Sequence, residues 1–528
     1  MRRRALSGLV LSLALLTAGC RSDEPAPAPA GGSGNAPAPG VLRVGVERPQ
    51  SLDPAQARSP AELLVAEQLF DSLTTYDPAT SAVQPALAGA WQASPDQRRW
   101  DFTLRGDARF GNNRPVNSGD VKYTLERIAR KGSSSPVAGL LELVTGFRAF
   151  NIEGRADGLA GVTTPAPDVV RIELDQPLSA LPALLGYPAF GIVPREAVEA
   201  ESPSFAVQPT GSGPFMIESR GDDVIRLVPA PGSLAGLKAL DLRMERDVAS
   251  SYAAFVDGRL DWTAVPADRV EQVAERQGRA GFRPYLGETF YAFNLKNPKY
   301  ADVRFREAIV RAVDRNAIVR LVYGSAGRQA SGLVPEGVPG FQVDACGPKC
   351  SFDPGRARAL LGEAFAGRPV PEVQIDFDDN PTQQAVAKAI QANLKEVGIP
   401  AGLRPKPFSE YVKFVRAGGE QEIFRLGSIG AYPTPDAFLT PLFQTGQRDN
   451  LTGFSSPAVD QLLRSGRAEA DEGRRLAAYQ QAEKAILDQV PVMPLVQFEF
   501  HSMVTPRVDG LVVSGLGTFD AAKVRLAT

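Results

Sequence analysis

The chain has 528 residues, 43% of them hydrophobic, with 58 Lys and Arg against 60 Asp and Glu and a formal net charge of −2. This length exceeds the roughly 100–200 residues of a single domain, so we expect two or three domains. The excess of acids argues against nucleic acid as a partner, because proteins that bind nucleic acid present a basic surface to the phosphates.

The first 20 residues have the features of a lipoprotein export signal. Three arginines, Arg2–Arg4, precede an apolar run over residues 6–16, and Thr17, Ala18 and Gly19 stand directly before Cys20. A cysteine after Ala-Gly is the residue that a bacterial lipoprotein peptidase leaves at the new N-terminus. The apolar run is shorter than the roughly 20 residues of a spanning helix. We predict a lipoprotein signal peptide over residues 1–19 and lipid on Cys20; an ordinary signal peptide with an incidental cysteine is the alternative.

A tether follows the predicted lipid site. Residues 25–40 consist of Pro, Ala, Gly, Ser and Asn alone. This composition cannot bury a core and behaves as a semi-flexible spacer. We therefore assign residues 20–40 to a flexible tether and expect the folded body to begin near Val41.

Predicted strands and helices alternate along the body, which indicates an α/β fold. Residues 41–47 are predicted as an early strand, and residues 100–104 alternate apolar and polar side chains as a half-buried strand does. Residues 170–174 repeat that alternation. Between these two strands, Ser118 is placed to cap a helix that ends near Gly132.

Helix signals are denser in the second half of the chain. A capping side chain precedes an apolar helical periodicity at four positions: Asp302, Asp314, Asn380 and Ser456. Gly398 stands where the glycine after the helix that starts at Asn380 is expected. A last amphipathic helix, over residues 476–490, leads through Pro491 into a predicted strand over residues 492–500.

The two remaining cysteines, Cys346 and Cys350, flank a Gly-Pro turn. In an oxidising compartment such a turn can bring the two sulfurs together, so we predict a local disulfide. A metal site is the alternative, but it needs further ligands, and His501 is the only histidine of the chain. The spacing also differs from the Cys-x-x-Cys of a redox pair.

The sequence lacks the common catalytic motifs. It contains no Gly-x-Ser-x-Gly elbow, His-Glu-x-x-His helix, Walker loop or Gly-x-Gly-x-x-Gly fingerprint. A single histidine disfavours a Ser-His-Asp site, while Ser-Lys chemistry or a carboxylate pair stays open. We therefore predict a protein that is not an enzyme, with no catalytic residue, no metal and no cofactor.

Short blocks spread over the mature chain point to one family. In chain order they are Leu52-Asp53-Pro54, residues 69–77, 85–88 and 100–105, Ser118-Gly119-Asp120-Val121, and residues 210–215, 302–308, 313–315, 352–357, 432–439, 456–460 and 491–495. Together they resemble the family 5 extracellular solute-binding proteins, the receptors of peptide, opine and nickel ABC importers. Residues 111–114 depart from the family's usual Asp-Gly turn but also suit a turn.

The resemblance implies an α/β, two-lobed periplasmic-binding-protein type II-like fold with an additional subdomain. Lobe I would comprise residues 41–288 with a subdomain inserted at about 61–189, lobe II residues 289–498, and residues 499–528 would return to lobe I. Two crossing strands, near residues 290–295 and 496–500, would form the hinge. Such a hinge lets the lobes close over a ligand.

The resemblance also implies a ligand site between the lobes. In peptide-binding relatives the segment equivalent to residues 426–432 offers backbone groups to an extended ligand, a form of β-augmentation; a buried strand without ligand contact is the alternative. These relatives carry an aspartate for the ligand's α-ammonium group where this chain has Ala431. We therefore expect a ligand without a free α-amino group or an ammonium held by another acid, and Asp436 is either that acid or a helix cap.

The predicted ligand-binding residues come from both lobes and the crossing strands. They are Ser212, Gly213, Tyr291, Asn294, Ser428, Ile429, Gly430, Ala431, Tyr432, Asp436, Phe498 and His501. For the aromatic residues, packing in the hinge is an equal alternative. His501 is either a contact for a nickel chelate or a structural residue.

The implied function is a lipid-anchored substrate-binding receptor of an ABC importer that captures a peptide or peptide-like solute and delivers it to the permease. The same fold binding a metal chelate, sugar or other solute is the first alternative, and a secreted enzyme or structural lipoprotein is the second. The expected partners are the solute, the permease subunits and the membrane through the lipid. We expect a monomer on the outer face of the cell membrane or in the periplasm.

Overall fold

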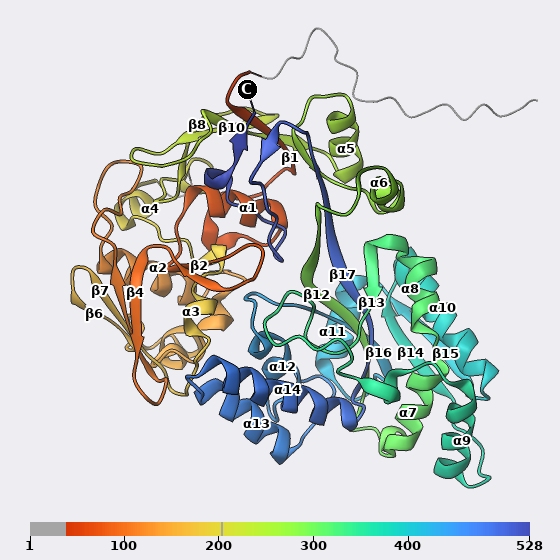
Figure 1. The fold of residues 1–528 in the computed structure, drawn as a ribbon. Helices are drawn as coiled ribbons and strands as arrows, with labels where there is room; N and C mark the ends of the chain where they lie inside the picture. The colour runs from red at the N-terminus through yellow and green to blue at the C-terminus, as the bar shows by residue number, and fades with distance from the viewer. Residues whose placement is uncertain (1–37, 202–203, 528) are drawn as a thin grey trace, which may run out of the picture.

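Two lobes joined by two long strands make up the protein (Figure 1). The computed structural model describes residues 38–201 and 204–527, so the predicted signal peptide, Cys20 and most of the tether lie outside the described residues. The joining strands are β12 (Phe282–Phe293) and β17 (Val492–Val504). We call residues 38–281 and 505–527 lobe I and residues 294–491 lobe II.

One sheet of eleven strands runs through both lobes. Its order is β15-β14-β16-β12-β17-β11-β1-β10-β9-β8, with β13 paired to β17 off this path. The lobe I strands are β1 (Val41–Glu47), β8 (Phe215–Arg220), β9 (Val224–Pro229), β10 (Ala239–Glu245) and β11 (Trp262–Ala264). The lobe II strands are β13 (Gly327–Gln329), β14 (Val373–Asp378), β15 (Ala401–Lys406) and β16 (Ile423–Ile429). The early strand predicted over residues 41–47 is confirmed.

The crossing strands are antiparallel neighbours, and their register shifts twice, between Pro284 and Glu288 and between Thr289 and Phe290. Such irregularities bend a strand locally and interrupt its ladder, which suits a connection between two bodies. Both strands are longer than predicted. The predicted lobe limits at residues 288 and 498 fall inside them and remain predictions.

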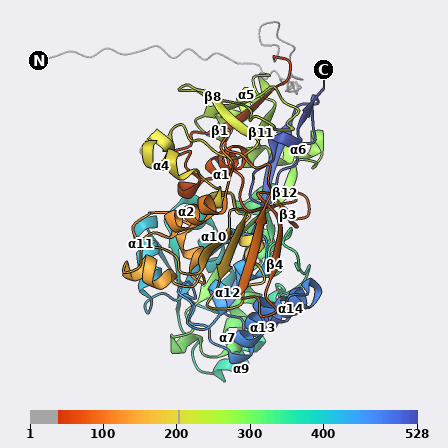
Figure 2. The same ribbon diagram turned by 90° about the vertical axis from the view of Figure 1, so that its left-hand side faces the viewer.

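Lobe I carries a subdomain built on a second sheet, with the order β4-β5-β7-β6. Its strands are β4 (Ala88–Ala93), β5 (Arg99–Leu104), β6 (Val162–Ala166) and β7 (Val169–Glu173), beside a hairpin of β2 (Thr74–Tyr76) and β3 (Val83–Pro85). The helices of lobe I are α1 (Pro60–Leu69), α2 (Ser118–Ala129), α3 (Leu181–Leu184), α4 (Arg195–Glu201), α5 (Val248–Val256) and α6 (Val270–Gln277). Strands β5 and β7 confirm both predicted alternations. In the side view of Figure 2, the part of lobe I with β1, β8 and α5 lies above lobe II, while the part with α2 and β4 overlaps lobe II.

One predicted cap is wrong by a residue. The N-cap of α2 is Asn117, whose side chain accepts from the Gly119 N–H at 2.8 Å, while Asp120 accepts from the Asn117 N–H. Ser118 is the first helical residue, and its hydroxyl donates to the Ala166 carbonyl at 2.7 Å. Asn and Ser are both good caps, so sequence alone does not choose between neighbours.

Lobe II is rich in helices. They are α7 (Val303–Ala312), α8 (Arg315–Val322), α9 (Pro354–Phe365), α10 (Pro381–Glu396), α11 (Phe408–Ala417), α12 (Pro435–Phe443), α13 (Pro457–Ala468) and α14 (Glu472–Asp488). Of these, α8, α10 and α11 contact strands of the sheet, and α12, α13 and α14 pack on one another. Asp302, Asp314, Asn380 and Ser456 cap helices as predicted. Gly398 follows the C-cap of α10 with φ +87°, the left-handed conformation that favours glycine.

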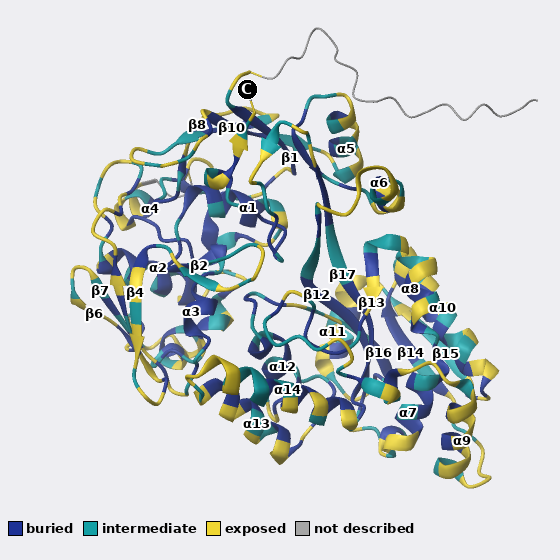
Figure 3. Ribbon diagram, in the orientation of Figure 1, coloured by how far each residue is buried: buried dark blue, intermediate teal, exposed yellow. Residues whose placement is uncertain are grey.

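Separate cores support the division into lobes. The largest is in lobe II, a second fills the subdomain and a third fills the rest of lobe I. Buried residues follow the sheets, while the outer faces of α9 and α13 are exposed (Figure 3). The end of the chain, with β18 (Val508–Asp509) and β19 (Arg525–Leu526), returns to lobe I, where Val513, Phe519 and Val524 join its core.

Two further observations concern the envelope predictions. Cys346 and Cys350 form a disulfide with a Cα–Cα distance of 5.6 Å, in the loop before α9. Over residues 38–201 and 204–527, no helix has the length and apolar character needed to cross a bilayer.

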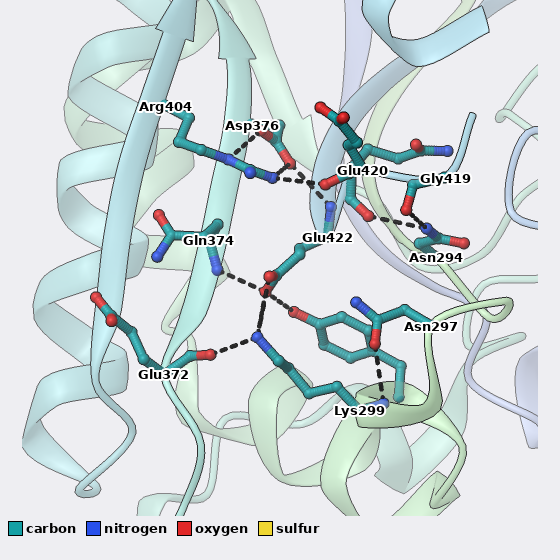
Figure 4. Close-up of polar contacts among 12 residues, drawn as sticks. Asn294, Asn297, Lys299, Glu372, Gln374, Asp376, Arg404, Gly419, Glu420 and Glu422 are labelled. Carbon is teal, nitrogen blue, oxygen red and sulfur yellow. Dashed lines mark hydrogen bonds and ion pairs between the residues drawn. The ribbon is translucent and has the colours of Figure 1, made fainter. Parts of the chain in front are cut away.

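A polar network centred on Glu422 joins the start of β16 to its neighbours (Figure 4). The Glu422 carboxylate accepts hydrogen bonds from three donors at 2.8–3.0 Å: Lys299 Nζ, the Tyr300 hydroxyl and the Gln374 N–H. The Glu422 N–H donates to Asp376 at 2.9 Å, and Asp376 pairs with Arg404 at 2.7 Å. The network therefore ties β14, β15 and β16 together at the end of the sheet where β14 and β16 begin.

Substituting Glu422 is expected to make the stability of lobe II less dependent on pH. Burial alone would raise the pKa of Glu422, but its hydrogen-bond donors and Lys299 hold that pKa below its ordinary value of 4.5. A lowered pKa means that the ionised group stabilises the fold above about pH 5 and that this contribution is lost as the pH falls through the lowered pKa. Urea denaturation should show a constant deficit for Glu422→Gln above pH 5 that shrinks towards pH 3.

Glu420 provides the control, because its side chain is exposed two residues before Glu422. Glu420→Gln should keep the stability of the native protein at each pH. An equal response of both variants to pH would contradict the role of the network.

Candidate ligand-binding site

Strand β16 has a free edge over its second half. Its antiparallel pairing with β12 places Ile429 opposite Gly287 and Ile423 opposite Phe293. On its other side, β14 pairs with β16 only at Ile423 and Phe424. Over the part of the chain that the structure describes, no strand is paired with the remainder of β16 on that side.

The hydrogen-bond pattern shows which backbone groups face this free edge. Gly430 N–H donates to the Leu286 carbonyl at 2.9 Å. Bonded pairs alternate along an antiparallel ladder, so Ser428 and Leu426 also bond to β12. The N–H and C=O groups of Gly427 and Ile429 therefore point away from β12. The side chain of Ile429 is 69% exposed.

A basic group lies at the start of the free edge. Arg425 pairs with Asp378 at 3.0 Å, and Asp378 ends β14. The Arg425 Nε and the Tyr291 hydroxyl are buried and have no hydrogen-bond partner among residues 38–201 and 204–527. Burial raises the pKa of Tyr291 and of the half-buried Tyr323 nearby, so both hydroxyls stay protonated donors at neutral pH. The described residues thus leave two donors unused, the Arg425 Nε and the Tyr291 hydroxyl, near the carboxyl end of β14.

The match to a family model decides the identity. The family described as bacterial extracellular solute-binding proteins, family 5 Middle, matches residues 82–450. The chain belongs to the family 5 bacterial extracellular solute-binding proteins. Its architecture is the two-lobed α/β type II periplasmic-binding-protein fold with an added subdomain, as the solved structures similar to it have.

Individual relatives are similar over nearly their whole length. The dipeptide-binding protein DppE of Bacillus subtilis is 28% identical over 97% of both chains. The periplasmic murein peptide-binding protein MppA of Escherichia coli is 27% identical over 89% of both, and its unliganded open form superposes with a TM-score of 0.82 over 92% of this chain and 97% of that one, at 25% identity. Heme-binding protein A of Haemophilus influenzae is 24% identical over 86% of both chains.

Asp436 of this family 5 protein is not exposed to a ligand. Its carboxylate is fully buried and pairs with Arg467 at 2.7 and 3.1 Å. It also accepts from three hydroxyls at 2.6–3.1 Å: Tyr432, Thr440 and Tyr479. Burial would raise the pKa of Asp436, but Arg467 and these donors hold it below its ordinary value. Neither predicted role is correct: the cap of α12 is Thr434, and Asp436 is a buried structural anion.

The predicted residues on β12 and beyond it are buried in lobe II. Asn294 is fully buried, and its Nδ2 donates to the Gln421 carbonyl at 2.9 Å. Tyr291 is also fully buried, although its free hydroxyl belongs to the Arg425 cluster. We therefore correct Asn294 to a structural residue.

The predicted ligand-binding residues of the second crossing strand, β17, contact other side chains of the protein. His501 is 6% exposed, packs edge-on against Phe282 with ring centroids 4.4 Å apart, and lies 3.3 Å from Glu499. This contradicts a direct contact of His501 with a nickel chelate. Phe498 is half-buried, and its ring packs against that of Tyr323 with the ring centroids 6.0 Å apart. No group of three or more His, Cys, Asp or Glu in the described ranges is arranged to hold a metal ion.

Ser212 and Gly213 form a turn packed on the end of α1. The Gly213 N–H donates to the Leu69 carbonyl at 3.0 Å, and a Cβ on Gly213 would lie 2.5 Å from the backbone of Leu69 and Phe70. The Ser212 hydroxyl accepts from the Asp71 N–H at 3.3 Å. Glycine is therefore required by close packing, and both residues are corrected to structural ones.

Of the residues that follow β16, some are packed against other side chains and others are partly exposed. A Cβ on Gly430 would lie 2.3 Å from the Phe438 ring, so Gly430 allows α12 to approach. Tyr432 is buried and packs in the subdomain core, while Ala431 is half-buried beside it. Of the predicted residues, Ser428, Ile429, Gly430 and Ala431 thus lie together along the free edge and its end. Arg425 was missed, although a lone charge inside an apolar strand was a visible signal.

Proposed function

We propose that this protein is the substrate-binding receptor of an ABC importer and holds a peptide or peptide-like solute as an added strand on the free edge of β16. The observation that carries the proposal is the unpaired backbone of Gly427 and Ile429. An extended peptide can pair with these groups whatever its side chains are. The names of the dipeptide-binding and murein peptide-binding relatives support the same class of ligand.

The Arg425 cluster would bind a carboxylate of the solute. Arg425 has a free Nε donor, and the Tyr291 hydroxyl beside it is a second donor without a partner. A carboxylate that accepts from an arginine forms a charge-assisted hydrogen bond, which is stronger than one between neutral groups. The C-terminus of a short peptide fits this requirement.

Capture would proceed by closure of the two lobes about β12 and β17. A ligand drives closure only through contacts that it makes better in the closed state. The similarity to an unliganded open form of MppA supports an open, ligand-accepting conformation for this structure. The receptor would then deliver the solute to the permease. It would act as a monomer held by lipid on Cys20 outside the cell membrane, and this tether would raise the local concentration of the receptor.

Two substitutions at Gly427 test the added strand. Gly427→Pro removes the N–H that faces the free edge, and proline is tolerated at edge positions whose N–H is not in the ladder. We expect this variant to bind tri-alanine about 10-fold more weakly or worse by isothermal titration calorimetry, because a ligand carbonyl is left without its donor. Gly427→Ala keeps the N–H, and its Cβ would meet no atom closer than 3.5 Å, so its affinity should stay near that of the native protein.

Equal affinities of the two variants would contradict β-augmentation. Native mass spectrometry of the protein purified without denaturation would then identify the solute that it carries. A peptide mass supports the proposal, whereas a metal chelate, haem or sugar would overturn it in favour of another solute on the same fold.

A further inference from the structure

We propose that Glu499 of β17 acts as a clamp between the two lobes, which holds them in the open arrangement and thereby limits the affinity for the solute. Its carboxylate pairs with one arginine on each side of the hinge, Arg279 and Arg328. We call these three side chains the Glu499 clamp. The inference rests on the proposed function for the ligand alone, and the clamp itself can be tested on the protein without a ligand.

Glu499 lies where β17 passes from one lobe to the other. Along the edge of β17 that faces away from β12, residues 496–498 pair with β13 of lobe II, and residues 502–504 pair with β11 of lobe I. Glu499 lies between these two stretches. On the other edge it is opposite Pro284, which has no N–H to donate, directly before a shift in the register. Backbone pairing between the crossing strands is therefore weakened at this residue.

Ion pairs connect the lobes at this point. Glu499 Oε2 lies 2.8 Å from Arg279 Nη2, in the loop between α6 and β12, and Glu499 Oε1 pairs with Arg328 Nη2 on β13. The side chain of Glu499 is only 3% exposed, whereas each arginine side chain is 49% exposed. Burial would raise the pKa of Glu499, but the contact with His501 and the two arginines hold it below its ordinary value. The carboxylate is therefore ionised at neutral pH, and its pairs with the arginines are charge-assisted.

The clamp is the ionic link between the lobes. Arg279 belongs to lobe I, and Arg328 belongs to lobe II, where it also pairs with Glu336 at 2.9 Å. All other ion pairs among residues 38–201 and 204–527 lie within one lobe or within β17. Close to the clamp, α6 contacts the turn Gly324–Ala326 of lobe II, and Figure 1 shows α6 above β13 and α8.

Closure of the lobes changes the distance between the two arginines. Arg279 and Arg328 are carried by different lobes, while Glu499 stays on the strand between them, so the carboxylate keeps both partners at one angle between the lobes. That angle is the open one, which the similarity to the open form of MppA supports. A ligand must replace the lost pairing through contacts that it makes in the closed state. The clamp therefore lowers the apparent affinity by keeping the closed form rare.

Glu499→Gln tests the clamp. It keeps the size of the side chain and removes the charge, and the half-exposed arginines are left in contact with water. Without a ligand, the variant should have a smaller radius of gyration than the native protein by small-angle X-ray scattering, because a larger fraction of it is closed. By titration calorimetry it should bind tri-alanine about 5- to 10-fold more tightly, in proportion to that fraction.

Glu336→Gln is the matched control, because Glu336 pairs with the same Arg328 but lies within lobe II. It should keep the radius of gyration and the affinity of the native protein. Arg279→Gln removes only the partner from lobe I, at an exposed position. It should change both quantities in the same direction as Glu499→Gln, and it takes the place of that variant if Glu499→Gln does not fold.

Two results would overturn the inference. One is a radius of gyration and an affinity that stay unchanged in both Glu499→Gln and Arg279→Gln. The other is an expanded protein or weaker binding in these variants, because the clamp would then belong to the closed form. If the native protein does not bind tri-alanine, the proposed function fails, and the scattering of the unliganded variants still decides whether the clamp exists.

Discussion

Replacing Asp436 by alanine is expected to lower the free energy of unfolding of lobe II by about 3–5 kcal/mol, because it leaves Arg467 buried without its counter-charge. The side chain of Arg467 is 11% exposed, and that of Asp436 is fully buried. The substitution also removes the acceptor of three hydroxyls. Urea denaturation followed by intrinsic fluorescence measures the loss.

The effect should extend to the contact between the lobes. The Arg467 carbonyl accepts from the Ser179 N–H at 2.8 Å, which joins α13 to the subdomain. The double variant Asp436→Ala with Arg467→Met should recover most of the lost stability, because replacing a whole buried pair by apolar groups is often nearly neutral. A deficit below about 1 kcal/mol in the single variant would contradict the structural role and return Asp436 to the list of ligand contacts.

Replacing Arg425 by glutamine is expected to weaken the binding of tri-alanine about 100-fold, since the ligand carboxylate loses its charged donor. The affinity for tri-alanine amide, which has no carboxylate, should change much less. Titration calorimetry of both peptides against both proteins gives the comparison. Asp378, left without Arg425, keeps a hydrogen bond from Asn380 Nδ2 at 2.5 Å, which limits the damage to the fold.

Arg404→Gln controls for the loss of an arginine in the same sheet. Arg404 pairs with Asp376 in the Glu422 network, and its loss should lower stability without changing the preference for a free carboxylate. If Arg425→Gln weakened the acid and the amide equally, the carboxylate would have to bind elsewhere.

Local signals made the secondary structure predictable. Asp302, Asn380 and Ser456 begin helices because a cap needs only its own side chain and the next three residues. The resemblance to the family then supplied the lobes and the segment around Ser428. Neither source fixed which crossing-strand side chains would be buried, because a central strand is apolar on both faces. From the sequence, Asn294 and Ile429 were therefore equally good candidates for contact with a ligand.

The polar residues of the site depended on partners far away in the sequence. Asp436 is satisfied by Arg467, 31 residues later, and that pairing has no local pattern. Arg425 is the opposite case: one of its nitrogens pairs with Asp378, while its Nε has no hydrogen-bond partner among the described residues. Whether a buried side chain has a hydrogen-bond partner can be judged only when the positions of all its neighbours in the fold are known.

The return of the chain end to lobe I has a consequence for biogenesis. Leu42, near the start of the folded body, shares its core with Val513 and Val524, and Asp261 pairs with both Arg43 and Arg507. A chain that is synthesised from its N-terminus presents residues 505–527 only after the whole of lobe II. Lobe II, by contrast, is one uninterrupted stretch and can pack as soon as it emerges. Lobe I, although it begins first in the sequence, is therefore the last lobe to complete its fold. Until residues 505–527 are released, its unpaired strands must be shielded from aggregation.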